Sequence, residues 1–324
     1  MAEKKDKLNI VFMGTPEFAA IILRKVAAWQ GGCISAVYTQ PDRPAGRGHK
    51  LMPSAVKVAA QELGLPVFQP LNFKTEEAKQ QLAALKPDIL AVAAYGLLLP
   101  QSVLDSAALA PLNVHGSLLP KYRGAAPIQR AIMDGEPETG VCIMHMQAAL
   151  DAGPVYARAA IGTAGHTAGS MHDALAVLGG DVLIGVLEQF RQGIPPCQPQ
   201  DESLVTFAPK ISKAEGIIDW NRPCAVVDAH IRGVTPWPAA RVQCCLTGRE
   251  PFALTIAKGC VGQAKPAGAQ AGELWLLPQG LGIATADALY MLEEVRPADR
   301  KAMAASAFVN GYLQGAQGLC GRVC

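Results

Sequence analysis

An asparagine and a histidine stand two residues apart at the end of an apolar run in the first half of the chain. Asn113 and His115 belong to the stretch NVHG, which follows Leu112. Side chains alternate between the two faces of a β-strand, so both residues would point the same way. An amide beside an imidazole can stabilise charge on a carbonyl oxygen and move a proton, as acyl transfer requires. The same spacing also suits a strand-end pair that only satisfies nearby backbone groups.

An aspartate follows later in the chain, within the stretch LDAG at residues 150–153. Aspartate before glycine is common in turns, and Asp151 could be no more than that. If it meets His115 in space, its carboxylate could hold the imidazole and help to remove a proton from an incoming amine. The spacing leaves both interpretations open.

A glycine-rich basic segment, PDRPAGRGHK, occupies residues 41–50. Its cations are Arg43, Arg47 and Lys50. Because it follows an apolar strand-like run, it should lie at the edge of the predicted sheet where ligands bind. Cations on such a loop suit contacts with phosphates, although a solvated surface loop would look similar.

Composition limits the classes of protein that this chain can be. With 324 residues and 50% apolar residues, two globular domains are expected. A net charge of +2 means that any nucleic-acid contact must come from local patches. The nine cysteines show no C-x-x-C spacing, which predicts reduced thiols in a cytosolic protein and no metal site. The apolar run at residues 8–13 is too short for a signal sequence, and no membrane segment is predicted.

The first part of the chain alternates strand-like and helix-like segments. Strands are predicted at residues 8–13, 33–39, 67–68, 89–94 and 112–115. Helices are predicted at about 15–30, 54–63, 75–85 and 168–192, a loop at 40–53, and a hairpin from 139–146 and 155–161. This alternation predicts an α/β fold with a doubly wound, Rossmann-like parallel sheet. Ligands bind such sheets beyond the carboxyl ends of the strands, where Asn113 and His115 are expected.

The pattern changes after a proline-rich stretch at residues 193–200. Short strand-like runs follow at 239–246, 252–257, 274–277, 281–284 and 288–295. Helices are predicted at 224–231 and 300–312. Short strands separated by turn residues predict a smaller β-barrel as the second domain.

These motifs together resemble the folate-dependent formyltransferases, and among them the family that acts on methionyl-tRNA. The resemblance rests on NVHGSLLPKYRGAAP at 113–127, PDRPAGRG at 41–48, AYGLLLP at 94–100 and LDAG at 150–153. In the second domain it rests on APKISKAEGIIDW at 208–220 and IRGVTPWPAA at 231–240. Residues 244–270 and those after 311 carry no comparable match.

The resemblance implies an activity and a domain plan. A formyl group would pass from 10-formyltetrahydrofolate to the amino group of initiator methionyl-tRNA, for translation initiation. Residues 1–194 would form the catalytic domain, 195–213 a linker, and 214–324 an OB-like tRNA-binding domain. The protein would be a cytoplasmic monomer that needs neither a metal nor a membrane.

The resemblance also implies roles for single residues. Asn113, His115 and Asp151 match the family's catalytic residues. The folate-binding segment corresponds to Ser117, Leu118, Leu119 and Pro120. The tRNA-binding residues it implies are Arg47 in the basic loop and Lys210 and Lys213 in the linker; charge and loop position add Arg43 and Lys50.

Three rival functions share some of these features. A formyltransferase for an aminosugar nucleotide would keep Asn113, His115 and Asp151 but should not need the PAGRG sequence. A hydrolase would release formate from 10-formyltetrahydrofolate with water as the nucleophile. An RNA-binding protein without activity would stack bases on aromatic side chains, yet aromatics are only 6% of the chain.

Overall fold

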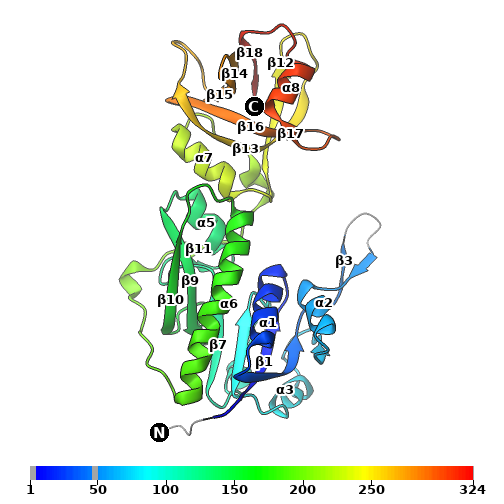
Figure 1. Ribbon diagram of the computed structural model, residues 1–324, viewed down its shortest axis with the longest axis vertical. Helices are drawn as coiled ribbons and strands as arrows, with labels where there is room; N and C mark the ends of the chain where they lie inside the picture. Colours follow the sequence, from blue (N-terminus) through cyan, green and yellow to red (C-terminus); the bar gives the residue numbers. More distant parts are fainter. Residues whose placement is uncertain (1–4, 46–49, 324) are drawn as a thin grey trace. The chain divides into compact units, whose positions relative to one another are not determined.

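The computed structural model describes residues 5–45 and 50–323 and shows two compact units (Figure 1). The first unit contains the chain up to Pro127 together with residues 139–162 and 172–208. The second contains residues 128–138 and 163–171 and the chain from Pro209 onward. Each unit therefore combines segments that are far apart in the sequence.

A seven-stranded sheet forms the centre of the first unit, with the strand order β10-β9-β7-β6-β1-β2-β5. Its strands are β1 (Leu8–Gly14), β2 (Gly32–Tyr38), β5 (Val67–Phe68), β6 (Ile89–Ala93), β7 (Ala110–His115), β9 (Glu138–His145) and β10 (Val155–Gly162). Strands β5, β2, β1, β6 and β7 pair in parallel in that order. Strand β9 pairs antiparallel to β7. The prediction of a doubly wound α/β sheet is confirmed.

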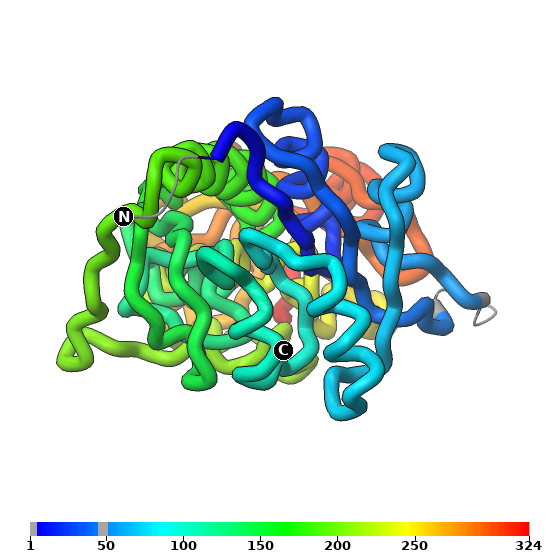
Figure 2. The backbone as a smooth tube through the Cα atoms, turned by 90° about the horizontal axis from the view of Figure 1, so that it is seen from below, coloured from blue at the N-terminus to red at the C-terminus, as the bar shows by residue number. Residues whose placement is uncertain are grey.

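Helices cover both faces of this sheet. They are α1 (Glu17–Ala28), α2 (Ala55–Glu62), α3 (Glu76–Ala83), α4 (Gln101–Leu104) and α6 (Ala168–Gln192). Figure 2 shows α1 and α6 on one side of the sheet and the segment with α3 and α4 on the other. A Cβ added at Gly179 of α6 would come within 2.8 Å of Val114, so the absence of a side chain lets α6 lie close to β7.

The segment between β2 and α2 differs from the loop that the sequence predicts. Short strands β3 (Arg43–Ala45) and β4 (Lys50–Met52) pair antiparallel. Leu51 and Met52 are both exposed on this hairpin. Sequence analysis predicts a loop here because the segment is rich in proline and glycine. Only three residues pair on each strand, which is too short for an alternating pattern to show.

Helix α6 is long and apolar enough to cross a membrane if length and composition alone are considered. Sequence analysis does not anticipate this property. Leu183, Leu187 and Phe190 of α6 are fully or almost fully buried inside the first unit. The core helix of a globular protein can have the same length and composition as a membrane helix. Its apolar side chains pack against other protein side chains, whereas those of a membrane helix contact lipid.

The second unit is built around an antiparallel sheet with the order β13-β12-β18-β14-β15-β16-β17. Its elements are α7 (Cys224–Gly233), β12 (Ala240–Leu246), β13 (Phe252–Ala264), β14 (Glu273–Leu277), β15 (Gly280–Ala284), β16 (Ala288–Pro297), β17 (Met303–Ala304), α8 (Ala305–Tyr312) and β18 (Gly318–Val323). Because β13 also pairs with β16, the sheet closes on itself as a barrel. The smaller barrel domain that the sequence predicts is therefore present.

Short elements complete the described chain. They are β8 (Arg123–Gly124), α5 (Pro127–Met133), η1 (Glu202–Leu204), β11 (Phe207–Ala208) and η2 (Lys213–Gly216). Strand β8 pairs in parallel with β11 and forms a two-stranded sheet in the first unit. This small sheet matters for the site described below.

Strand β18 joins the two halves of the barrel sheet, although sequence analysis does not predict it. It pairs with β12 on one side and β14 on the other, and Cys320 and Val323 are buried. Ending the chain at Gln317 is expected to lower the free energy of unfolding of the second unit by about 3 kcal/mol or more, because two buried side chains and two ladders are lost. Urea unfolding followed by tryptophan fluorescence would measure this.

The matched control for the truncation is Arg322→Ala, which changes an exposed side chain on the same strand. It should unfold at nearly the same urea concentration as the parent chain. Equal midpoints for the truncated and the full chain would show that β18 is dispensable for the barrel.

Candidate active site at the carboxyl end of β7

Asn113 and His115 lie two residues apart at the carboxyl end of β7, at the sheet edge where ligands bind. In the register with the antiparallel neighbour β9, Asn113 lies opposite Met144 and His115 opposite Cys142. The Asn113 side chain is partly exposed, and no hydrogen-bond partner for its amide is found within residues 5–45 and 50–323. An amide without a partner at a strand end can donate to a bound oxygen atom.

The imidazole of His115 is buried and held by a backbone carbonyl. His115 is 5% exposed, and its Nε2 lies 3.0 Å from the carbonyl oxygen of Tyr122. A carbonyl oxygen can only accept, so Nε2 carries a hydrogen and donates it. Nδ1 is then the ring nitrogen that can gain or lose a proton.

Asp151 is brought to the same place from the connection between β9 and β10. Its Oδ2 lies 3.7 Å from Nδ1 of His115, which is ion-pair distance but longer than a hydrogen bond. The same oxygen accepts a hydrogen bond of 2.8 Å from the backbone N–H of Gly124. Asp151 has a left-handed backbone with a φ of 47°, a conformation that aspartate tolerates better than most residues.

The predicted folate segment, residues 117–120, is anchored on β9. The Ser117 hydroxyl is fully buried and donates to the carbonyl oxygen of Lys121, 2.7 Å away. The N–H of Leu119 donates to the Sγ of Cys142 at 3.3 Å, and burial raises the pKa of that thiol, which therefore stays protonated near neutral pH. Leu118 and Pro120 are partly exposed and could contact a ligand, whereas Ser117 and Leu119 support the turn.

The predicted tRNA-binding residues lie in separate places. Arg43 is exposed on β3, and Lys50 begins β4. Arg47 falls outside the described residues. Lys210 and Lys213 belong to the second unit and are exposed, with no ion pair to either in the part of the chain that the structure describes.

Three groups that sequence analysis misses surround Asp151. The Gly124 N–H bonds its carboxylate, the Gln200 side chain bonds its backbone carbonyl, and Arg123 bonds Gln200. Arg123 and Gly124 lie within the motif NVHGSLLPKYRGAAP at residues 113–127, and this position is a signal that could have identified them. Gln200 comes from the proline-rich stretch and carries no such mark.

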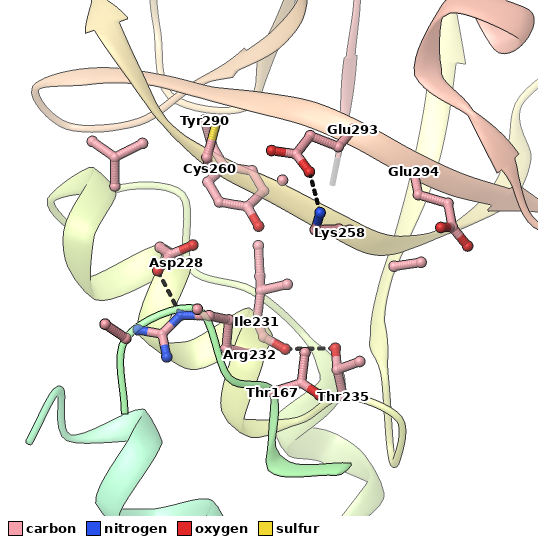
Figure 3. Close-up of a pocket in the computed structure, with 15 residues that line it drawn as sticks. Thr167, Asp228, Ile231, Arg232, Thr235, Lys258, Cys260, Tyr290, Glu293 and Glu294 are labelled. Carbon is pink, nitrogen blue, oxygen red and sulfur yellow. Dashed lines mark hydrogen bonds and ion pairs between the residues drawn. The ribbon is translucent and has the colours of Figure 1, made fainter. Parts of the chain in front are cut away.

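A separate cavity of about 680 Å³ lies in the second unit, between α7, β13 and β16. Its charged residues pair with each other: Asp228 with Arg232 at 2.7 Å, and Lys258 with Glu293 at 2.8 Å (Figure 3). None of the predicted site residues lines it. Asn113 and His115 lie instead at the carboxyl end of β7.

Metal ligands do not gather anywhere in the described residues, where no group of three or more His, Cys, Asp or Glu side chains could hold an ion. The donor set at β7 has one imidazole, one carboxylate and one amide. Such a set suits hydrogen bonding and proton transfer.

Comparison with known proteins places the chain in a family. Residues 8–187 match the formyl transferase family, and residues 210–313 match the formyl transferase C-terminal domain. A methionyl-tRNA formyltransferase of Nitratidesulfovibrio vulgaris is 50% identical over 322 residues, which cover 99% of this chain and 97% of the relative. One from Desulfovibrio desulfuricans is 50% identical over 330 residues, covering the same shares.

Solved structures share the fold at low identity. HypX from Aquifex aeolicus in complex with tetrahydrofolic acid has a TM-score of 0.60 and 17% identity, covering 96% of this chain and 48% of that one. An N-formyltransferase from Helicobacter canadensis, in complex with folinic acid and dTDP-3-aminofucose, has a TM-score of 0.59 and 14% identity, covering 91% of this chain and 100% of that one. From the two family matches and the relatives at half identity, we conclude that the chain belongs to the formyl transferase family, in the group of the methionyl-tRNA formyltransferases.

Proposed function

We propose that the protein transfers a formyl group from 10-formyltetrahydrofolate to the free amino group of initiator methionyl-tRNA. The observation that carries the proposal is the convergence of Asn113, His115 and Asp151 at the end of β7. The relatives that are 50% identical along nearly their whole length bear the name of this activity.

The site residues would act on the carbonyl as the amine adds to it. The Asn113 amide and a protonated Nδ1 of His115 donate hydrogen bonds to the formyl oxygen while it gains negative charge. The Tyr122 carbonyl, rather than Asp151, holds the imidazole in place, since only the former is within hydrogen-bond distance. This differs from the role for Asp151 that the sequence suggests.

Asp151 is then available to take a proton from the attacking amine. As the new C–N bond forms, the amine loses a proton to the carboxylate, directly or through a water molecule. The bond from the formyl carbon to the folate nitrogen breaks, and that nitrogen takes up a proton as it leaves. The proton is conserved overall, and the products are the formylated amine and tetrahydrofolate.

Contacts with the two substrates would come from the segments flanking this centre. Residues 117–120 would contact the folate, mainly through the partly exposed Leu118 and Pro120. The cations Arg43, Arg47, Lys50, Lys210 and Lys213 would contact the tRNA phosphates. We also propose that the protein works as a monomer in the cytoplasm, which gel filtration and cell fractionation would test.

One assay tests the proposed activity. The protein is mixed with 10-formyltetrahydrofolate and methionine-charged initiator tRNA, and formyl incorporation is followed, with charged elongator tRNA as the control. Incorporation into the initiator tRNA alone supports the proposal. Formate release without incorporation, or transfer to an aminosugar nucleotide in preference to the tRNA, would contradict it.

Replacement of Arg47 tests the role of the basic segment. Arg47→Ala is expected to raise KM for the tRNA about tenfold and leave KM for the folate unchanged, because one phosphate contact is lost. The salt dependence of tRNA binding should fall by about one unit of slope. Arg24→Ala, which removes an exposed arginine of α1, is the control and should change neither constant. An unchanged KM for the tRNA in Arg47→Ala would remove this segment from the tRNA contact.

A further inference from the structure

The stretch before the second unit contributes side chains to the surroundings of the active site. Gln200 donates from Nε2 to the carbonyl oxygens of both Asp151 and Gly153, at 2.7 Å each. One amide group therefore fixes the two backbone carbonyls that flank Ala152. The positive φ of Asp151 makes such an external anchor useful, because a non-glycine residue in that conformation is held by its surroundings.

Gln200 is itself held from behind by a buried arginine. Its Oε1 accepts hydrogen bonds from Nε and Nη2 of Arg123, at 3.1 and 2.9 Å. Arg123 is 5% exposed and also pairs with Glu202, at 2.7 Å. The hydrogen bond from Arg123 lowers the pKa of the Glu202 carboxyl, so the pair stays ionised at neutral pH. The oxygen of the Gln200 amide thus faces Arg123, and its N–H₂ must face the Asp151 turn.

The same stretch also supports the partner of His115. The Thr206 Oγ1 accepts a hydrogen bond of 2.9 Å from the N–H of Tyr122, whose carbonyl oxygen binds Nε2 of the imidazole. Pairing of β11 with β8 aligns these groups. Residues 200–208 therefore support both Asp151 and His115. They do so through the backbone of Asp151 and through Tyr122, without contacting the carboxylate or the imidazole.

We propose that Gln200 is a positioning residue for Asp151. It holds the turn so that the carboxylate stays within reach of His115 and of an incoming amine. The inference rests on the proposed function, since it assigns Gln200 a part in the same proton transfer. Displacing a reacting group by about 1 Å can cost about a hundredfold in rate, so the anchor should be visible in turnover.

Gln200→Glu is the sharpest variant, because it keeps the size of the side chain and the contact with Arg123. A carboxylate has no hydrogen to donate, so the two bonds to Asp151 and Gly153 are lost and the new oxygen repels both carbonyl oxygens. We expect kcat for formyl transfer to fall about tenfold to a hundredfold, with KM for the folate nearly unchanged. Gln198→Glu makes the same chemical change at an exposed position two residues earlier, and it should have normal kcat.

A second variant separates this role from support of Arg123. Gln200→Met keeps the length, adds no charge and removes both the donors and the acceptor. If kcat falls in both variants, the donated bonds are responsible. If kcat falls only in Gln200→Met, the effect belongs to Arg123, and the proposal is overturned. Thermal unfolding of each variant shows whether the fold is kept.

A double-mutant cycle with Asp151→Asn distinguishes positioning from a general structural effect. If Gln200 acts through Asp151, Gln200→Glu should cost less than about twofold in kcat once Asp151 is replaced. Full additivity would overturn the proposal. Failure of the parent enzyme to formylate methionyl-tRNA would reject the proposed function instead, whereas an active parent with a normal Gln200→Glu variant would reject only the role of Gln200.

Discussion

Asn113→Ala is expected to lower kcat for formyl transfer by about 10²–10³-fold while KM for the folate stays nearly the same. In the proposed mechanism the Asn113 amide donates to the formyl oxygen as that oxygen becomes negatively charged, so its loss should affect the transition state more than the bound substrate. Initial rates of formyl incorporation at saturating concentrations of both substrates would measure the change in kcat.

The variant should remain folded, because the Asn113 amide has no hydrogen-bond partner within the described residues and its side chain is partly exposed. Asn113→Asp provides an isosteric test, since it keeps the shape but has no hydrogen to donate, and it should lose as much activity. The control is Asn310→Ala on α8, which makes the same truncation at an exposed position. Normal turnover of Asn113→Ala would rule out the proposed role in stabilising the oxyanion.

Asp151→Asn is expected to lower kcat by about 10²–10⁴-fold, the range in which a positioned acid or base contributes. The carboxamide is nearly the same shape, and its oxygen can still accept the hydrogen bond from Gly124 N–H. It has no negative charge to offer the imidazole and cannot accept the proton of the amine. Folding should therefore be kept while proton transfer is lost.

The control for Asp151→Asn is chosen to match its backbone conformation. Asp299 also has a left-handed backbone, with a φ of 57°, and lies exposed in the turn between β16 and β17. Asp299→Asn should leave kcat and the unfolding temperature unchanged. A kcat for Asp151→Asn within a factor of about two of the parent would mean that the carboxylate is a turn residue without a part in the reaction.

The separation between Asp151 and His115 has a consequence for how the two groups work. At 3.7 Å the carboxylate is close enough for charge to attract a protonated Nδ1, but too far to fix the tautomer by a hydrogen bond. The carbonyl of Tyr122 fixes it from the other side of the ring. The orientation of the ring is therefore set by a backbone carbonyl, and the carboxylate of Asp151 lies at ion-pair distance from its other nitrogen.

The stabilising contacts around the site also explain why its residues come from distant parts of the chain. The turn that holds Asp151 is anchored on Gly124, and a Cβ added at Gly124 would come within 2.8 Å of the carbonyl oxygen of Ala208. The positive φ of Gly124, 124°, also disfavours any other residue. The glycine therefore permits β8 and β11 to approach closely.

Sequence patterns by themselves determined the alternating strands and helices of the first unit and the change to short strands in the second. They also placed Asn113 and His115 together at the end of one strand. These features follow from local rules, since apolar runs and helical periodicity are written in neighbouring residues. Helix α6 illustrates this, because its observed bounds, Ala168–Gln192, are those that the pattern predicts.

Only the tertiary structure decided the features that depend on partners far along the chain. Strand β18 exists because β12 and β14 each offer it a ladder. The β3–β4 hairpin is local, but only three residues pair on each side, too few for a sequence pattern to show. The distance from Asp151 to His115 and the anchor provided by Gln200 arise in the same way as β18. The carbonyl that holds the imidazole belongs to Tyr122, only seven residues from His115, and is placed by the turn between them. Hydrogen bonds between residues dozens of positions apart are set by how the packed elements align, and no pattern in neighbouring residues records that alignment.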